Sequence, residues 1–177
     1  MSVWLLKIQI EGGFVGKLLF KQKSKLNKWD ERFCRLAEHV SVWSKDKTKV
    51  GAVLFSQKGG DITIGYNGFP MGVEDSVDRL MDTETKLEFV VHAEVNAIIA
   101  AGSRARGATL YVWGKPICSR CAGPIIQAGI KKVVSPKPSL NTESKWDKSG
   151  QIAEQMFKEA GIEIQYYREE ECENNCC

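Results

Sequence analysis

The stretch VGAVLFSQKGGDITIGY, residues 50–66, decides the fold of this 177-residue chain. Two runs that are rich in β-branched and aromatic residues, VGAVLF and ITIGY, flank the polar, glycine-containing segment SQKGGD. Strand-forming runs with a short polar segment between them are typical of a β-hairpin. The sequence therefore predicts that a sheet begins here with two antiparallel strands.

Upstream of this hairpin, the sequence predicts a helix that begins at Asn27. The Asn27 side chain can cap the first turn, and Asp30 places a carboxylate where the helix dipole favours one. We expect Cys34 to be a small buried residue and His39 to face solvent. Apolar side chains at helical spacing predict one buried stripe, which consists of Trp29, Phe33, Leu36, Val40 and Trp43.

Downstream of the hairpin, helical and strand patterns alternate. The loop NGFPMGVED (67–75) precedes two predicted helices, over 77–89 and from His92 to Gly102, and then the strand TLYVW (109–113). The helix CSRCAGPIIQAGI (118–130), which Gly129 can cap, and the strand KKVVS (131–135) follow. The last predicted elements are a helix that ends at Gly161, with Ile152, Met156, Phe157 and Ala160 on its apolar side, and the strand IEIQYY (162–167). This order predicts an α/β fold, a three-layer α/β/α sandwich around a mixed five-stranded sheet.

Composition favours one globular domain inside the cell. With 43% hydrophobic residues, the chain can bury a sizeable core, and a net charge of +3 is too small to indicate nucleic acid. The apolar run VWLLKIQI (3–10) is too short to span a membrane and lacks the arrangement of a cleaved signal peptide. Six cysteines without such a signal indicate reduced thiols or metal ligands. We therefore expect a cytoplasmic protein.

The domain organisation follows from these patterns. Residues 1–26 form an N-terminal extension of mixed apolar and basic character, to which we assign no role, and residues 27–167 form the folded domain. Residues 168–177 form an acidic, cysteine-containing tail that we expect to be disordered. Metal binding by this tail is an alternative, but it contains no histidine, and an exposed tail is the better interpretation; its cysteines are Cys172, Cys176 and Cys177.

Cys118 and Cys121 have the spacing of metal ligands. At a helix start their two sulfur atoms face the same side, and the exposed amides and the helix dipole favour thiolates. A structural zinc site needs four protein ligands, and the other cysteines lie in the first helix or the tail, so His92 is the better third ligand. Three protein ligands leave one position for water, whose pKa zinc lowers to about 7. Such a site indicates hydrolysis.

Glu94 follows His92 by two residues in the segment VVHAEVNAIIA (90–100). A histidine and a glutamate in one helical turn are often only a cap, but the downstream cysteine pair favours a catalytic interpretation. Glu94 could reach the water without binding the metal and shuttle its protons. The order H-x-E and then C-x-x-C is typical of zinc-dependent nucleobase deaminases, in which the activated water attacks the ring carbon that carries the exocyclic amine.

The segments around these residues carry a family resemblance. SKDKTKVGAV (44–53), GYNGFPMGVED (65–75), TKLEFVVHAE (85–94), HAEVNAI (92–98) and CAGPIIQAGIKKVV (121–134) resemble the deoxycytidylate (dCMP) deaminases of the cytidine and deoxycytidylate deaminase family, over Trp29 to Tyr167. The resemblance implies a cytidine deaminase-like fold and a zinc-dependent deaminase domain over 27–167. It also implies that the protein hydrolyses dCMP to ammonia and dUMP, and that dUMP supplies a precursor for dTTP synthesis. One departure concerns the family's proline-cysteine pair, because Ile117 stands between Pro116 and Cys118.

The resemblance also implies two substrate contacts, and the residue types suggest further ones. Asn67 would contact nucleotide hydroxyls or base edges, and the backbone amide of Ala93 would bind the pyrimidine carbonyl. Trp113 could stack on the base or simply pack at a strand end. A monophosphate could bind any of several cations, of which we include Lys45 in the predicted site; the others are Arg79, Lys86, Arg104, Lys115 and Arg120.

Some members of this family are hexamers that dCTP and dTTP control through sites that include the glycine-rich GYNG region. The resemblance thus implies a homo-oligomer (hexamer, tetramer or dimer), with dCTP or dTTP as effectors together with Mg²⁺. Two alternatives stay open. The protein could deaminate another cytosine nucleotide or single-stranded nucleic acid, which calls for a basic groove with interleaved aromatic residues. It could also be a catalytically silent zinc-containing nucleotide-binding module, although an intact Glu94 favours an enzyme.

Overall fold

The computed structural model of the chain describes residues 26–139 and 144–167. The predicted N-terminal extension, apart from Leu26, and the predicted acidic tail with its three cysteines lie outside these residues. Across the two described ranges, no helix combines the length and the apolar character that crossing a membrane requires.

A five-stranded mixed sheet forms the centre of the structure, with the strand order β2-β1-β3-β4-β5. The predicted hairpin is confirmed: β1 (Gly51–Ser56) pairs antiparallel with β2 (Asp61–Tyr66). β1 also pairs antiparallel with β3 (Thr109–Trp113), and β3 continues in parallel to β4 (Lys132–Pro136) and β5 (Glu163–Tyr167). The parallel half brings the carboxyl ends of β3, β4 and β5 to one edge of the sheet.

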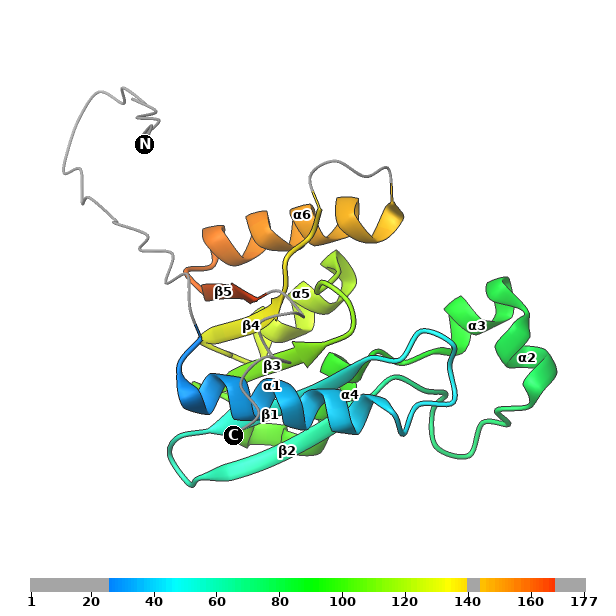
Figure 1. Cartoon of the computed structure of the whole chain (residues 1–177), viewed down its shortest axis with the longest axis horizontal. Helices are drawn as coiled ribbons and strands as arrows, with labels where there is room; N and C mark the ends of the chain where they lie inside the picture. The colour runs from blue at the N-terminus through cyan, green and yellow to red at the C-terminus, as the bar shows by residue number, and fades with distance from the viewer. Residues whose placement is uncertain (1–25, 140–143, 168–177) are drawn as a thin grey trace.

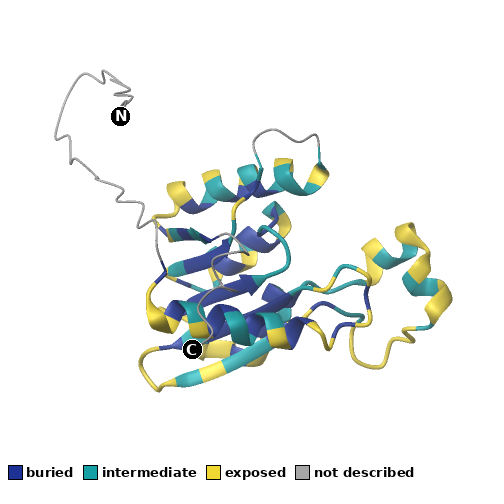
Figure 2. Cartoon of the chain, in the orientation of Figure 1, coloured by how far each residue is buried: buried dark blue, intermediate teal, exposed yellow. Residues whose placement is uncertain are grey.

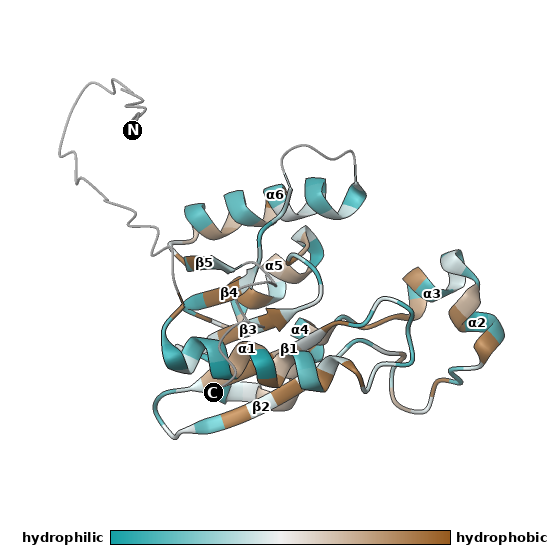
Figure 3. Cartoon of the chain, viewed as in Figure 1, coloured by the Kyte–Doolittle hydropathy of each residue, from teal (hydrophilic) through white to brown (hydrophobic). Residues whose placement is uncertain are grey.

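Helices cover both faces of this sheet, which confirms the predicted three-layer sandwich (Figure 1). α1 (Lys28–Ser41) packs on one face, and α4 (Ala93–Ala101), α5 (Ser119–Gln127) and α6 (Lys145–Glu159) pack on the other. Because side chains alternate along a strand, Val53 faces α1 while Leu54 faces the opposite layer. The buried residues follow the sheet and the inner sides of the helices (Figure 2), and the strands at the centre of the sheet are largely apolar (Figure 3).

α1 begins as predicted and packs differently from the prediction. The Asn27 side chain accepts hydrogen bonds from the backbone N–H groups of Trp29 and Asp30. Cys34 is buried and His39 is exposed, as predicted. The predicted stripe is wrong at both ends, because Trp29 is 62% exposed and Trp43 is 49% exposed. Small residues bring α1 close to the sheet instead: a side chain at Gly51 would lie 1.9 Å from the carbonyl oxygen of Ala37.

The segment predicted as one helix over 77–89 forms two short helices, α2 (Val77–Met81) and α3 (Thr83–Phe89). Asp82 interrupts the helix because its backbone is extended, with φ −77° and ψ 109°, and its side chain caps α3 by accepting from the N–H of Glu84. Neither helix contains a buried residue. The pair stands away from the sheet as an arm (Figure 1).

α4 lies against β2 through a glycine. A side chain at Gly65 would come within 2.4 Å of the Ala93 carbonyl oxygen and 2.5 Å of the Ala97 nitrogen, so only glycine permits this approach. α4 stops at Gly102, as predicted, and a short 3₁₀ helix, η1 (Gly102–Ala105), follows it without a sequence signal that we identified. The contact with β2 fixes the start of α4, where the site lies.

Candidate active site

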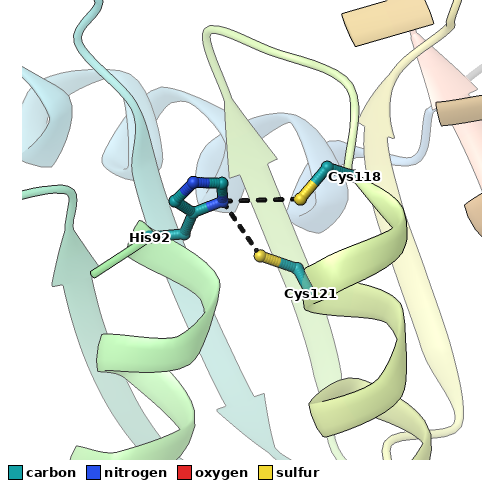
Figure 4. A group of neighbouring side chains, drawn as sticks. All are labelled: His92, Cys118 and Cys121. Carbon is teal, nitrogen blue, oxygen red and sulfur yellow. Dashed lines mark hydrogen bonds between the residues drawn. The ribbon is translucent and has the colours of Figure 1, made fainter. Parts of the chain in front are cut away.

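Three potential metal ligands meet where α4 and α5 begin. His92 is the N-cap residue of α4, Cys118 is the N-cap residue of α5, and Cys121 lies in the first turn of α5. The His92 Nδ1 atom lies 3.2 Å from the Cys121 sulfur and 3.5 Å from the Cys118 sulfur (Figure 4). The three ligand atoms lie within 4.8 Å of one another, so they could hold a single ion.

The donor set fits zinc. Zn²⁺ prefers imidazole nitrogen and thiolate sulfur in a tetrahedral arrangement. Hydrogen bonds from Cys121 and His92 lower the pKa of Cys118 to about 4, so its sulfur takes the thiolate form that binds metal. The pKa of Cys121 is raised because its thiol donates to Cys118 and because it is buried. Within the described ranges, this group brings together three ligands, which leaves one tetrahedral position for a water or a substrate atom.

Glu94 is buried beside this group. It lies in the first turn of α4, and the residue is only 3% exposed. Burial raises the pKa of its carboxyl group, and the charge of His92 opposes that change. A buried carboxyl group with a raised pKa is typical of a group that transfers protons.

A single cavity joins Glu94 to His92 and Cys118. Five separate parts of the chain form its remaining wall: the loop before β1, the residue after β2, the helix α3 with the segment that follows it, the loop before α5, and α6. The lining residues from these parts are Asp46, Thr48, Val50, Asn67, Lys86, Leu87, Val90, Lys115, Pro116 and Trp146, and Ala93 completes the set.

Asn67 lies in the cavity, and much of its side chain is already engaged. Its Oδ1 atom accepts from the Val50 N–H at 2.8 Å, and its Nδ2 atom donates to the Thr48 carbonyl oxygen at 2.9 Å. The Ser44 hydroxyl donates to the Asn67 carbonyl oxygen at 2.8 Å. A primary amide has two donor hydrogens and two lone pairs, so one of each is left. Asn67 therefore holds the loop before β1 and still has capacity for a ligand, a double role that the sequence did not indicate.

The other predicted substrate residues divide into two groups. Ala93 lines the cavity at the first position of α4, where helix N–H groups have no intrahelical acceptor. Lys45 does not line the cavity, because it is exposed and its Nζ atom pairs with Asp75 at 2.8 Å. Trp113 does not line it either, because its ring stacks on Tyr167 with the centroids 5.7 Å apart. We therefore leave Lys45 and Trp113 out of the site.

Two features of the cavity were not predicted. Trp146, at the start of α6, places its ring centroid 6.0 Å from that of His92. Nothing in the sequence near Trp146 marks it as a cavity residue, because the two rings meet only through the packing of α6. Asp46 forms an ion pair across the cavity wall with Lys86, whose Nζ atom lies 3.1 Å from the Asp46 Oδ1 atom. Asp46 stands in the resembling segment SKDKTKVGAV, which is the signal that could have identified it.

Comparison with known proteins agrees with this geometry. The sequence profile of the cytidine and deoxycytidylate deaminase zinc-binding region matches residues 27–136. An uncharacterized deaminase from the luxG 3′ region of Aliivibrio fischeri is 40% identical over 140 residues, which cover 78% of this chain and 93% of that protein. The deoxycytidylate deaminase of Homo sapiens is 38% identical over 121 residues, which cover 64% of this chain and 67% of that protein.

A solved structure has the same fold. The dCMP deaminase of cyanophage S-TIM5, in complex with dCMP and dUMP, superimposes with a TM-score of 0.60 and a sequence identity of 26%. The match covers 81% of this chain and 99% of the phage protein. The fold of this chain is thus shared with a protein whose structure contains dCMP and dUMP.

Proposed function

We propose that this chain, which belongs to the cytidine and deoxycytidylate deaminase family, hydrolyses dCMP to dUMP and ammonia. The observation that carries the proposal is the metal-ligand group His92, Cys118 and Cys121 with the buried carboxyl group of Glu94 in the same cavity. The human relative, named a deoxycytidylate deaminase, and the phage dCMP deaminase that binds dCMP and dUMP support this choice of substrate. The product dUMP would supply a precursor for dTTP synthesis.

His92, Cys118 and Cys121 are the residues that would hold Zn²⁺. When bound, zinc acts as a Lewis acid that acidifies a water molecule at its open coordination position. The starts of α4 and α5 support this assignment, because the N-cap residues His92 and Cys118 and the first-turn residue Cys121 present the nitrogen and both sulfur atoms to one another.

Glu94 would move both protons of the reaction. As the water oxygen forms a bond with ring carbon C4, the Glu94 carboxylate accepts one water proton and delivers it to ring nitrogen N3. The same carboxylate then transfers the remaining hydroxyl proton to the exocyclic nitrogen while the bond between C4 and that nitrogen breaks. The water oxygen becomes the new carbonyl oxygen of dUMP, and the amine leaves as ammonia. The buried position of Glu94 supports this role, since bulk water cannot compete for the protons.

The cavity wall would orient the nucleotide. The N–H of Ala93 would donate to the pyrimidine carbonyl oxygen, and the free donor and acceptor of Asn67 would contact the sugar hydroxyl. The Trp146 ring beside His92 would offer the base an apolar surface. These roles need no contribution from Lys45 or Trp113.

A panel of substrates tests the function and its runner-up. Purified zinc-loaded protein is mixed in turn with dCMP, CMP, deoxycytidine and a cytosine-containing single-stranded oligodeoxynucleotide, and the loss of cytosine absorbance is followed. We expect dCMP to be the best substrate. Preference for the oligonucleotide would favour the nucleic-acid alternative, and nucleotide binding without turnover would favour the silent binding module.

We also propose that the protein is a homo-oligomer. The arm formed by α2 and α3 supports this, because it buries none of its residues and exposes a set of large apolar side chains: Val77, Met81, Leu87 and Phe89. Sedimentation equilibrium gives the mass directly. A mass of one chain at micromolar concentration would contradict the proposal.

We further propose that the enzyme is cytoplasmic and that dCTP and dTTP, together with Mg²⁺, control its activity. The support for this control is the resemblance of the GYNG segment (65–68) to the effector region of regulated family members. Initial rates at subsaturating dCMP, with each nucleotide added in turn with Mg²⁺, provide the test. Rates that neither nucleotide changes would remove the regulatory part and leave the catalytic part intact.

A further inference from the structure

Two lysines line the cavity, and they differ in their surroundings. Lys86 on α3 is held by Asp46, with 3.1 Å between Nζ and Oδ1 and side chains that are 17% and 6% exposed. Asp46 Oδ1 also accepts from the Thr48 N–H at 2.9 Å. The charge of Lys86 is therefore neutralised by a shielded carboxylate, and Lys86 ties the arm to the loop before β1.

Lys115 has no such partner. It is half-buried in the loop between β3 and α5, next to Pro116 and three residues before Cys118. Across residues 26–139 and 144–167, no ion pair or hydrogen bond of its side chain is found. Glu94 lies at the metal end of the cavity, and Asp46 is occupied by Lys86. Lys115 therefore adds an uncompensated positive charge to the cavity wall.

The loop that carries Lys115 is fixed on both sides. Gly114 has a φ of +100°, and a side chain there would lie 2.3 Å from the Lys49 carbonyl oxygen, so the backbone packs tightly against the loop before β1. Pro116 lies beside Gly150 of α6, where an added methyl group would meet the proline Cβ at 3.3 Å. Ile117, which interrupts the proline-cysteine pair, is buried in the core. The backbone that carries Lys115 is thus packed against the rest of the fold on both sides of the residue.

We infer that Lys115 binds the 5′-phosphate of the substrate and thereby makes the enzyme prefer a nucleoside monophosphate to the free nucleoside. This inference rests on the proposed function. A lysine ammonium is a compact charge that pairs well with phosphate oxygens, and such a pair is stronger in a partly buried wall than on an open surface. Lys86 does not bind the phosphate in this proposal, because its charge is already paired with Asp46. It is a positioning residue that holds α3 against the loop before β1.

Paired substrates isolate the phosphate contact. In Lys115→Met, which keeps the length of the side chain and removes its charge, kcat/KM for dCMP falls about 10- to 100-fold, mainly through KM. The value for deoxycytidine, which lacks the phosphate, stays unchanged. Lys115→Arg recovers most of the loss. Lys131→Met removes one exposed positive charge before β4 and serves as the matched control, with both values unchanged.

Binding of product provides a readout that does not require turnover. Measured by calorimetry, the affinity for dUMP falls in Lys115→Met by the same factor as kcat/KM for dCMP, and the affinity for deoxyuridine does not change. If wild-type protein does not deaminate dCMP, the proposed function fails. The inference alone is overturned if wild-type protein deaminates dCMP and Lys115→Met has the wild-type ratio of kcat/KM for dCMP to kcat/KM for deoxycytidine. This holds whether the two kcat/KM values fall together or neither of them falls.

Discussion

Glu94 is the residue on which the proposed chemistry depends. Its carboxyl group is buried next to the small residues Ala93 and Ala97, where a charged group is costly without a compensating role. Replacement by glutamine keeps the shape of the side chain and removes its ability to carry a proton.

We therefore expect Glu94→Gln to lower kcat by about 10²- to 10⁴-fold. Zinc content stays at one ion per chain, because His92, Cys118 and Cys121 are intact. Steady-state rates and metal analysis on the same sample provide the check, and Glu88→Gln, an exposed change on α3, is the control. Wild-type turnover in Glu94→Gln would exclude the assigned proton path.

Asn67 combines structure and function at one position. Asn67→Ala leaves the Val50 N–H and the Thr48 carbonyl oxygen without their partners, so the free energy of unfolding falls by about 1–3 kcal/mol and KM rises. Urea denaturation measures the first effect. Asn96→Ala removes a single hydrogen bond, from Nδ2 to the Tyr66 carbonyl oxygen, and should cost less. Equal stability of both variants would show that Asn67 does not hold the loop.

Residues with a motif around them were predictable from the sequence, and residues placed by packing were not. Cys118 and Cys121 are three residues apart at a predicted helix start, and His92 stands at the start of another predicted helix. These positions indicated the group that the structure brings together. Lys45 is a candidate only because it is a cation, and Trp113 because it is an aromatic residue just before the loop that leads to Cys118. Their neighbours Asp75 and Tyr167, which lie far away in the sequence, keep both side chains out of the cavity.

At the scale of helices and strands, the site depends on how closely α4 approaches β2. Gly65 permits that approach, so Gly65→Ala should force the two backbones apart and destabilise the fold by about 1–3 kcal/mol or more. The matched control is Gly123→Ala within α5, where no atom lies within 4 Å of the added methyl group. This control should gain about 0.5–1 kcal/mol from helix propensity. Urea midpoints that shift in the same direction for both variants would contradict this account.

The attachment of α1 to the sheet depends on a buried carboxylate. Asp30 accepts from the Tyr111 hydroxyl at 2.8 Å, and its other oxygen lies 3.0 Å from the Lys132 Nζ atom. Asp30→Asn leaves the shielded Lys132 charge uncompensated and should cost about 3–5 kcal/mol. Thermal or urea unfolding measures the loss, and Asp75→Asn, which breaks an exposed pair, should leave stability unchanged. A small effect of Asp30→Asn would mean that solvent reaches Lys132.

Local signals predicted most elements, and their failures have local causes. Strand composition and the segment between the strands gave the hairpin, and Asn27 marked the start of α1. The segment 77–89 has helical composition on both sides of Asp82, but Asp82 caps a new helix more favourably than it continues the old one. The predicted stripe on α1 is wrong at its ends because the small buried residues Cys34 and Ala37 allow the helix to lie close to β1, and Trp29 and Trp43 remain exposed.

At the scale of the whole molecule, the sandwich assembles one cavity from parts that lie far apart in the sequence, from Asp46 before β1 to Trp146 on α6. The alternation of elements predicted the layers, yet it could not predict which residues of α6 would face His92. That choice depends on the packing of α6 against α5 and on the path of the loop before α5.

Because zinc would join α4 to α5, its removal should loosen this assembly. A metal that binds only the folded state stabilises it, so chelation should lower the melting temperature of the wild type. Glu94→Gln should show the same drop, since it keeps all three ligands. Cys121→Ala should melt at the chelated temperature with or without added zinc, and a zinc-dependent shift in that variant would place the metal elsewhere.

Zinc-dependent turnover of dCMP is the most direct test of the central claim. Metal-depleted protein is titrated with Zn²⁺ while dCMP absorbance is followed and the product is identified by mass. We expect activity to rise in proportion to added zinc, to level off at one ion per chain, and to yield dUMP with an equal amount of ammonia. Full activity without zinc, or one bound zinc per chain with no dUMP formed, would contradict the account.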